Sequence, residues 1–569
     1  MCFVHYKMNY DKILVELGEF GPWQIVITLL LWLPAAVDGV MTLIASYTSL
    51  VPEAYRCNIP DCDGPGFGFS DFPKQKLFPS FNEATPNYCQ YFSPIVLANG
   101  SCSYNFSSDV LQCSSSSDFT YEKDSFVMSS TLVTEFNMFC DNDKTIWIPV
   151  FNSCFMIGLG IGSFFFGLLS DRIGRRHTLL IAILLCSGGS LAGSIVPNYW
   201  SYAILRIIVG AGSEGCYIVA FTMVLEIVGV RDRLPCLKWV SFSTFQGNMV
   251  MIPFAMGMIL VSMTAMVLSN WRDLQLALSL ICLATASVWM FIPESPRWLL
   301  AHGREEEARE VVRRAAKKNG VTLSDEVFNK ESENGDMIEG GLSQYGLKDI
   351  FHPSLVKITL AMFVCWPVST LLYYGLTFSA DNIHLTDNTF LSFIIVAAVE
   401  IPPSLFLILV MDIWGRKPLL VFSFLLPGIS CLAAGWLEEG VLFTIFVLVG
   451  KFFATASFNI VNIYTAELYP TSIRTTMFGT CSTVARIGGV LAPWVAVYLP
   501  NQGSFGKEIP LYIFGSTSVA GGLMALLLPE TLGSPLPNTF QDVEDMKVNG
   551  KSIWKCADPL SYNVSNCSI

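Results

Sequence analysis

Twelve apolar segments, each 20 residues or longer, recur along the 569-residue chain. A helix needs about 20 mainly apolar residues to cross a bilayer. Because 52% of the residues are hydrophobic and only 14% are charged, the composition also indicates a membrane protein. The net charge of −12 argues against a nucleic-acid binder. The predicted spans lie near 22–46, 147–169, 178–197, 200–227, 239–263, 272–292, 357–379, 389–411, 418–437, 441–466, 475–499 and 508–528.

Basic residues in the short loops predict the orientation. Lys and Arg accumulate on the cytoplasmic side of a membrane protein. Here they follow the second, fourth, eighth and tenth spans, whereas the loops at 197–200, 380–388 and 438–440 contain none. We therefore expect a multi-pass plasma-membrane protein with both termini in the cytoplasm.

The segment after the first span has the composition of an extracellular domain. From Tyr47 to Lys144 it holds 12 Asp or Glu against 5 Lys or Arg. Two N-x-Ser sequons predict glycosylation at Asn99 and Asn105. An even number of cysteines in such a loop predicts three disulfides whose pairing stays open. The cysteines are Cys57, Cys62, Cys89, Cys102, Cys113 and Cys140.

This pattern divides the chain into seven parts. We expect a cytoplasmic N-terminus over 1–21, the first transmembrane helix over 22–46 and a glycosylated, disulfide-bonded extracellular loop over 47–146. Transmembrane helices 2–6 then occupy 147–292, and a cytoplasmic loop with helices occupies 293–356. Helices 7–12 fill 357–528, and a cytoplasmic tail covers 529–569.

Three motifs occur twice, once in each half of the chain. The pattern D-x-x-G-R-[RK] follows the second span at 171–176 and the eighth at 412–417. A Glu and an Arg seven positions later close the fourth and tenth spans, and a P-E-[ST] motif follows the sixth and twelfth. The chain is therefore predicted to be an all-α membrane protein with two pseudo-symmetric six-helix bundles, the plan of the major facilitator superfamily.

These repeated charges have two interpretations. Carboxylates and arginines at helix ends can form charge-assisted bonds that hold the halves together in one state and break in another. Alternatively, the basic residues only enforce the topology. The first interpretation assigns a conformational role to Asp171, Arg172, Arg175, Arg176, Glu226, Arg233, Asp412, Arg416, Lys417, Glu467 and Arg474.

Several motifs resemble the organic cation, anion and carnitine transporter family of this superfamily. They are GLLSDRIGRR at 167–176, PESPRWL at 293–299, YTAELYPTSIR at 464–474 and LPETLG at 528–533. The long cysteine-rich first loop is similar too, whereas sugar transporters share only part of the loop motifs. The resemblance implies transport of small organic ions by alternating access.

Charged residues within the spans indicate the charge of the substrate, because charges in a membrane are costly and mark functional sites. The resemblance implies that Arg486 binds a substrate carboxylate and that Glu400 is an acidic position common in the family. Asp38 is an added acid where related transporters tend to have Asn. Mixed charges favour a zwitterion such as a carnitine-like betaine. The alternative is that Arg486 and an acid form a structural ion pair.

Aromatic residues favour a cationic group on the substrate. Trp366 and Tyr373 are seven residues apart, so a helix places them on one face, and they match aromatic positions of cation transporters. Quaternary ammonium groups bind to such rings. Gln246 is a candidate neutral partner. The alternative for both aromatics is packing against lipid or core.

A glycine-rich stretch at 210–215 matches G-x-G-x-x-G but lies inside a span, where close helix packing explains it better than nucleotide binding. Within it, Glu214 has no obvious partner in the sequence. The chain lacks a phosphate-binding loop motif and a zinc-ligand motif. We expect no catalytic residues, no metal and no cofactor.

The sequence therefore predicts a polyspecific carrier of small organic zwitterions or amphipathic organic cations, not an enzyme. An organic anion transporter or exchanger that uses Arg486 is the alternative, and a receptor or adhesion protein is more remote. The expected partners are an organic ion and membrane lipid, with the chain acting as a monomer. Coupling to sodium, protons or a counter-substrate stays open.

Overall fold

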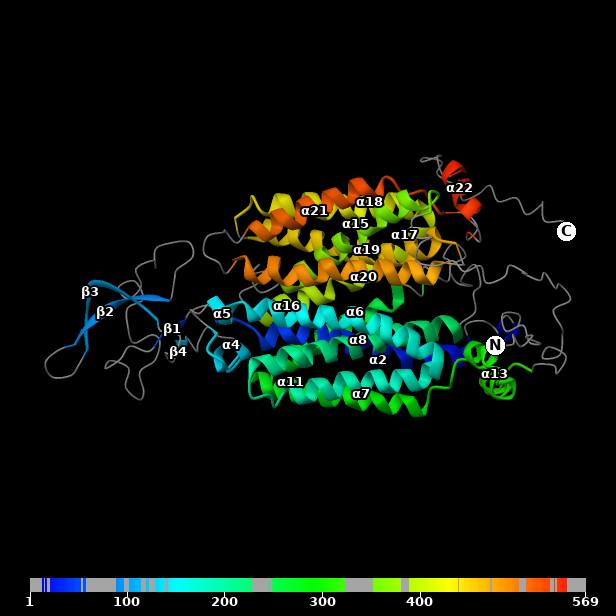
Figure 1. Cartoon of the computed structure of the whole chain (residues 1–569), viewed down its shortest axis with the longest axis horizontal. Coiled ribbons are helices and arrows are strands. Elements are labelled where there is room, and N and C mark those ends of the chain that lie inside the picture. Colours follow the sequence, from blue (N-terminus) through cyan, green and yellow to red (C-terminus); the bar gives the residue numbers. More distant parts are fainter. Residues whose placement is uncertain are drawn as a thin grey trace.

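The computed structural model describes much of the chain, including most of the helical bundle. The described residues are 13–14, 16–17, 21–52, 55–57, 89–96, 102–113, 119–121, 128–138, 142–227, 245, 248–322, 352–379, 388–438, 440–470, 473–500, 508–532, 537 and 540–549. Figure 1 shows long helices running side by side, with the strands at one end and helices α13 and α22 at the other. We call these the strand end and the α13 end.

The N-terminal half contributes one group of helices, in blue to green in Figure 1. Its long helices are α2 (Pro22–Thr48), α6 (Trp147–Ile173), α7 (Arg175–Gly193), α8 (Tyr199–Ile227), α10 (Met251–Ala265) and α11 (Trp271–Ala284), which continues as the 3₁₀ helix η2 (Thr285–Met290). Shorter helices are α4 (Leu132–Glu135), α5 (Asn142–Thr145), α12 (Pro296–Ala301) and α13 (Glu305–Asn319).

The C-terminal half contributes a second group, in light green to red. Its helices are α15 (Val356–Phe378), α16 (Thr389–Ala398), α17 (Ile401–Trp414), α18 (Arg416–Ala434), α19 (Val441–Leu468), α20 (Arg474–Pro493), the π-helical η4 (Trp494–Tyr498), α21 (Ile509–Ala525) and α22 (Phe540–Asn549). Ten helices in the described residues are long and apolar enough to cross a membrane, and α10 and α21 are shorter apolar helices. The expectation of twelve spans stays a prediction.

The outer surface of the bundle is apolar. Phe164, Met263, Ile429, Ile487 and Leu523 are each more than half exposed, although a soluble protein would bury such side chains. Asp38, Glu214, Glu400 and Lys451, in contrast, are buried. Apolar side chains outside and charges inside fit a protein whose surroundings are hydrocarbon.

Close helix contacts explain the glycines of α8. A Cβ atom added at Gly210 would lie 2.3 Å from the Phe155 carbonyl oxygen of α6, and one at Gly212 would lie 2.6 Å from the Cys186 backbone nitrogen of α7. Backbones approach this closely only where a side chain is missing. The G-x-G-x-x-G stretch therefore serves packing between α8 and its neighbours.

The predicted span 389–411 is interrupted. Helix α16 ends at Ala398 and α17 begins at Ile401, with Glu400 as its N-cap residue. Pro402 and Pro403 follow directly, and proline has no backbone N–H to continue the hydrogen-bond ladder. The break places Glu400 at the positive end of a helix dipole, which favours its negative charge.

The large loop contains two small antiparallel sheets. Strand β1 (Tyr55–Cys57) pairs with β4 (Phe119–Tyr121), and β2 (Gln90–Val96) pairs with β3 (Cys102–Gln112) in a register that joins Gln90 to Gln112. Cys89 and Cys113 are disulfide-bonded, and the Cys113 N–H donates to the Cys89 carbonyl oxygen at 2.9 Å. Cys57, Cys102 and Asn105 lie in strands. Cys62, Cys140 and Asn99 lie outside the described residues, so the disulfides of the other four cysteines and the two glycosylation sites stay predictions.

Candidate functional site

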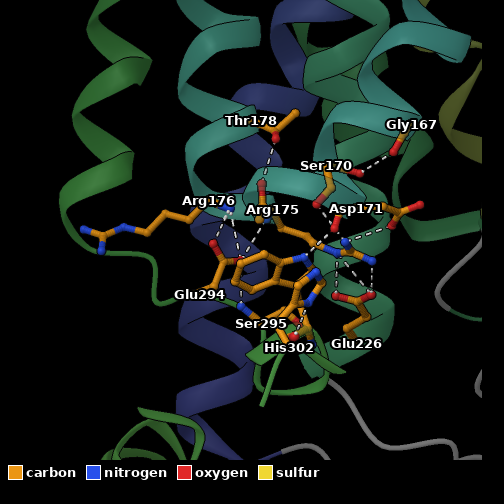
Figure 2. A network of polar contacts seen from close by, with 12 residues as sticks. Gly167, Ser170, Asp171, Arg175, Arg176, Thr178, Glu226, Glu294, Ser295 and His302 are labelled. Carbon is orange, nitrogen blue, oxygen red and sulfur yellow. Dashed lines mark hydrogen bonds and ion pairs between the residues drawn. The ribbon is translucent and has the colours of Figure 1, made fainter. Parts of the chain in front are cut away.

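The first repeated motif forms an ion network between α6 and α7 (Figure 2). The Arg175 guanidinium lies 2.9 Å from the carboxylates of both Asp171 and Glu226, and it donates to the Ser170 carbonyl oxygen at 2.8 Å. Glu294 accepts the backbone N–H of Arg175 at 2.8 Å. All these partners belong to the N-terminal half.

Gly174 makes this arrangement possible. Its φ of 98° lies where side-chain-bearing residues are strained. A Cβ atom there would lie 2.3 Å from the Glu294 carboxylate. The glycine thus ends α6 and lets Glu294 bind the first N–H groups of α7, where a helix dipole favours an anion.

Arg176 takes a different direction. Its Nε–H donates to the Trp289 carbonyl oxygen at 3.0 Å and its guanidinium lies 4.4 Å from the centre of the Trp289 ring. Figure 2 shows its side chain pointing away from Arg175 and Glu226. Arg172 is exposed, and Arg233 lies outside the described residues.

The second copy of the motif repeats the network in the C-terminal half. The Arg416 guanidinium lies 2.8 Å from Asp412 and 3.0 Å from Glu467. Glu530 accepts the backbone N–H groups of Arg416 at 3.0 Å and of Lys417 at 3.1 Å. Gly415, with φ 90°, corresponds to Gly174.

Arg474 does not join this network through a hydrogen bond or ion pair in the described residues. Its Nε–H donates to the Tyr469 carbonyl oxygen at 3.3 Å, which ties the start of α20 to the end of α19. Glu467 instead accepts a hydrogen bond from the Thr531 hydroxyl at 2.5 Å. In the C-terminal half, the Glu and Arg of the second repeated motif therefore have separate partners.

Two of the contacts between the halves lie toward the strand end. Tyr47, at the end of α2, packs against the rings of Phe390 and Phe393 at the start of α16, with ring centres 5.9 and 4.8 Å away. Near the start of α6, the Ser153 hydroxyl donates to the Val490 carbonyl oxygen of α20 at 2.9 Å. The two arginine networks, at the α13 end, each stay within one half among the described residues. The predicted gating role of these charges stays a prediction.

Arg486 joins the halves deeper in the bundle. Its Nη2 lies 2.6 Å from Oε1 of Glu214 on α8, and both side chains are largely buried. Asp38 of α2 accepts a hydrogen bond from the Ser213 hydroxyl at 2.7 Å, and it is close enough to Arg486 to interact electrostatically. One carboxylate of the N-terminal half thus pairs with a guanidinium of the C-terminal half, and a second acts on it electrostatically. Glu214 is the partner of Arg486 that the sequence did not identify.

Glu400 has a partner that the sequence analysis missed. Lys451 of α19 places its ammonium 2.7 Å from Glu400 Oε1, and both side chains are 1% exposed. The Tyr373 hydroxyl donates to the other Glu400 oxygen at 2.7 Å. A lysine within the predicted span 441–466 was the available signal, because an intramembrane charge needs a partner.

The predicted aromatic residues are both buried but have different neighbours. Trp366 donates from Nε1 to the Thr465 hydroxyl at 2.9 Å and meets Phe478 edge to face. Tyr373 stacks on Phe458, with ring centres 4.8 Å apart, and lies 6.4 Å from the ring of Phe254 on α10. Tyr373 therefore lies at the boundary between the halves. Gln246 lies outside the described residues.

Comparison with known proteins gives the family. The model of the family described as sugar (and other) transporter matches residues 95–541. The organic cation transporter protein of Drosophila melanogaster is 34% identical over 95% of both chains. The organic cation/carnitine transporter 2 of Homo sapiens is 31% identical over 95% of this chain and 94% of its own.

Solved structures show the same fold. The xylose transporter XylE from E. coli, in a partially occluded inward open conformation, superposes with a TM-score of 0.57 at 16% identity. The match covers 90% of this chain and 99% of that one. The fold is thus that of the major facilitator superfamily, and the chain belongs to its organic cation, anion and carnitine transporter family.

Proposed function

We propose that this protein moves small organic zwitterions or amphipathic organic cations across the plasma membrane by alternating access. The observation that carries the proposal is the charge arrangement around Arg486. There, a guanidinium of one half meets the carboxylates of Glu214 and Asp38 from the other half. In this superfamily the substrate lies between the halves near the middle of the membrane, and these residues lie at that boundary.

A zwitterion can bind to this arrangement at both ends. A substrate carboxylate would compete with Glu214 for Arg486, whose planar guanidinium can hold a carboxylate through two hydrogen bonds. A substrate ammonium would bind to Asp38, which keeps only the Ser213 hydroxyl as a hydrogen-bond partner within the described residues. The rings of Phe254 and Phe458 beside Tyr373 offer aromatic faces nearby.

The contacts between the halves support alternating access. The α2–α16 and α6–α20 contacts join the halves toward the strand end, whereas the ion-pair partners of the two networks, among the described residues, stay within one half. In the proposed cycle the halves rock about the central charges, and the networks change partners. We further propose that the strand end is extracellular, that both termini are cytoplasmic and that the protein works as a monomer.

One observation favours a second function, organic anion transport or exchange. Lys451, which is 1% exposed, is a cation inside the C-terminal half in addition to the largely buried Arg486. In that case an organic anion with a carboxylate and no cationic group would be a substrate. Removing Asp38 would then leave uptake intact.

The test is uptake of a labelled betaine into cells that express the parent, Asp38→Asn or Arg486→Ala, at equal surface amounts. We expect both variants to lose about tenfold or more in uptake, because each removes one charged contact with the substrate. Arg314→Ala, on the exposed face of α13, is the matched control and should equal the parent.

Equal uptake by Arg486→Ala and the parent would overturn the carboxylate contact. Uptake that survives in Asp38→Asn would favour the anion transporter. Ligand that binds to intact cells but never becomes protected inside vesicles would indicate a receptor instead.

A further inference from the structure

Lys451 has the surroundings expected for a bound substrate cation. Its ammonium lies 2.7 Å from Glu400 Oε1, 2.6 Å from the Thr377 hydroxyl and 3.3 Å from the Tyr373 carbonyl oxygen. The same nitrogen lies 4.1 Å from the centre of the Tyr373 ring. A carboxylate, an aromatic face and oxygen acceptors are the groups that recognise organic ammonium ions.

The location of these groups is as informative as their chemistry. Glu400 lies at the break between α16 and α17, and broken helices form the substrate sites of many transporters. Tyr373 contacts Phe254 of the other half, and it is close enough to Asp38 to interact with it electrostatically. The Lys451 ammonium therefore occupies a position next to the proposed substrate site.

Lys451 occupies this position, so Glu400 is already paired with a cation of the chain itself. Glu400 and Lys451 are both buried, so neither can exchange its partner for water at low cost. While the pair is intact, the negative charge of Glu400 is neutralised and its oxygens are engaged by Lys451 and Tyr373. A substrate cation gains little from Glu400 in that state.

We propose that Lys451 determines specificity by acting as a tethered cation that competes with substrate cations for Glu400 and the Tyr373 ring. This inference rests on the proposed function and differs from the expectation that Glu400 contacts the substrate directly. The parent therefore takes up organic cations less well than zwitterions, because Lys451 occupies Glu400 and Arg486 occupies Glu214, which leaves Asp38 for the cationic group. Its selectivity for a second, negative group on the substrate follows from Arg486.

Removing the positive charge of Lys451 should shift the selectivity toward cations, and removing the negative charge of Glu400 should shift it toward anions. Uptake of choline, glycine betaine and tert-butylacetate, which share one shape and differ in charge, is measured for the parent, Lys451→Gln and Glu400→Gln. We expect Lys451→Gln to raise the choline to betaine uptake ratio about tenfold, because it leaves a carboxylate beside an aromatic ring. Glu400→Gln leaves an ammonium and should raise the tert-butylacetate to betaine ratio by about the same factor.

The double variant Lys451→Gln with Glu400→Gln should lose both gains, because neither charge remains. Lys357→Gln, an exposed lysine of α15 in the same half, removes a positive charge without touching the pair and should keep the parental ratios. A variant that fails to reach the surface is purified and its thermal stabilisation by choline or tert-butylacetate is compared with that of the parent.

Unchanged ratios or ligand stabilisation in both single variants would overturn the proposal, as would a gain of choline uptake that persists in the double variant. These outcomes differ from a failure of the proposed function, in which the parent itself takes up none of the three compounds.

Discussion

The arginine networks of the two halves use the same residue types at the same spacing, yet they differ in their access to water. Asp171 in the N-terminal half is 71% exposed, whereas its counterpart Asp412 is 7% exposed. The arginines differ less, with Arg175 at 11% and Arg416 at 6%. A duplicated sequence thus produces the same ion pairs in unequal surroundings. We expect the C-terminal network to contribute more to stability and the N-terminal one to be freer to change partners.

Removing Arg416 or Arg175 should show the difference in stability between the two networks most strongly. Arg416→Ala leaves Asp412 and Glu467 buried without their cation, at a cost of about 3–5 kcal/mol. Arg175→Ala should cost roughly half as much, because water already solvates Asp171. Thermal unfolding of the purified variants measures both. An Arg175→Ala variant that is the less stable of the two would contradict the account.

The glycines before the two arginines should behave alike. Gly174→Ala and Gly415→Ala place a Cβ atom at positive φ and against Glu294 or Glu530, at a cost of about 1–3 kcal/mol in either half. Because both carboxylates cap a helix, the two losses should agree closely in the same unfolding assay. A loss confined to one half would mean that the two caps are not equivalent.

Neutralising the aspartates tests the difference in exposure directly. Asp171→Asn should change stability by less than about 1 kcal/mol, as expected for an exposed ion pair. Asp412→Asn should lower the free energy of unfolding by more than Asp171→Asn does, because its partner Arg416 is buried. If the exposed aspartate has the predicted gating role, Asp171→Asn should alter the uptake rate while stability stays near that of the parent. Uptake and unfolding that change together would argue against that role.

The smallest effect is expected from an ion pair at the strand end. Glu135 accepts hydrogen bonds from Trp271 and Arg272 at 2.7 and 2.6 Å. Partial burial acts to raise the pKa of Glu135, but these bonds outweigh it, and its pKa lies below the usual 4.5.

A folded-state pKa below the unfolded one means that the contribution of Glu135 is complete at neutral pH. It is lost as the pH falls below about 4.5 and through the folded-state pKa. The unfolding temperature of the parent should therefore approach that of Glu135→Gln at acidic pH. A constant difference between them across this range would contradict the assignment.

Much of the fold could be predicted, because the signals are local or repeated. Apolar stretches indicated the helices, and the repeated motifs pointed to two matched halves. The break at Glu400 could also have been found, since Pro402 and Pro403 follow it, but the apolar run around them hid it. Hydropathy averages over a window and is insensitive to such a break.

The pairing of the central charges could not be predicted. Glu214 and Arg486 are 272 positions apart, and Glu400 and Lys451 belong to separate helices with no spacing rule between them. Only the packing of the two halves brings the first pair together, and only the packing of α17 against α19 brings Glu400 to Lys451. A buried charge indicates that a partner exists, but it does not identify which residue that partner is.

The central claim is that the site recognises both ends of a zwitterion. The most direct measurement is uptake of glycine betaine, choline and tert-butylacetate by the parent at matched concentrations. We predict that betaine is taken up at least about tenfold better than either singly charged compound, because only betaine can engage Arg486 and Asp38 together. Equal or better uptake of tert-butylacetate would contradict the claim.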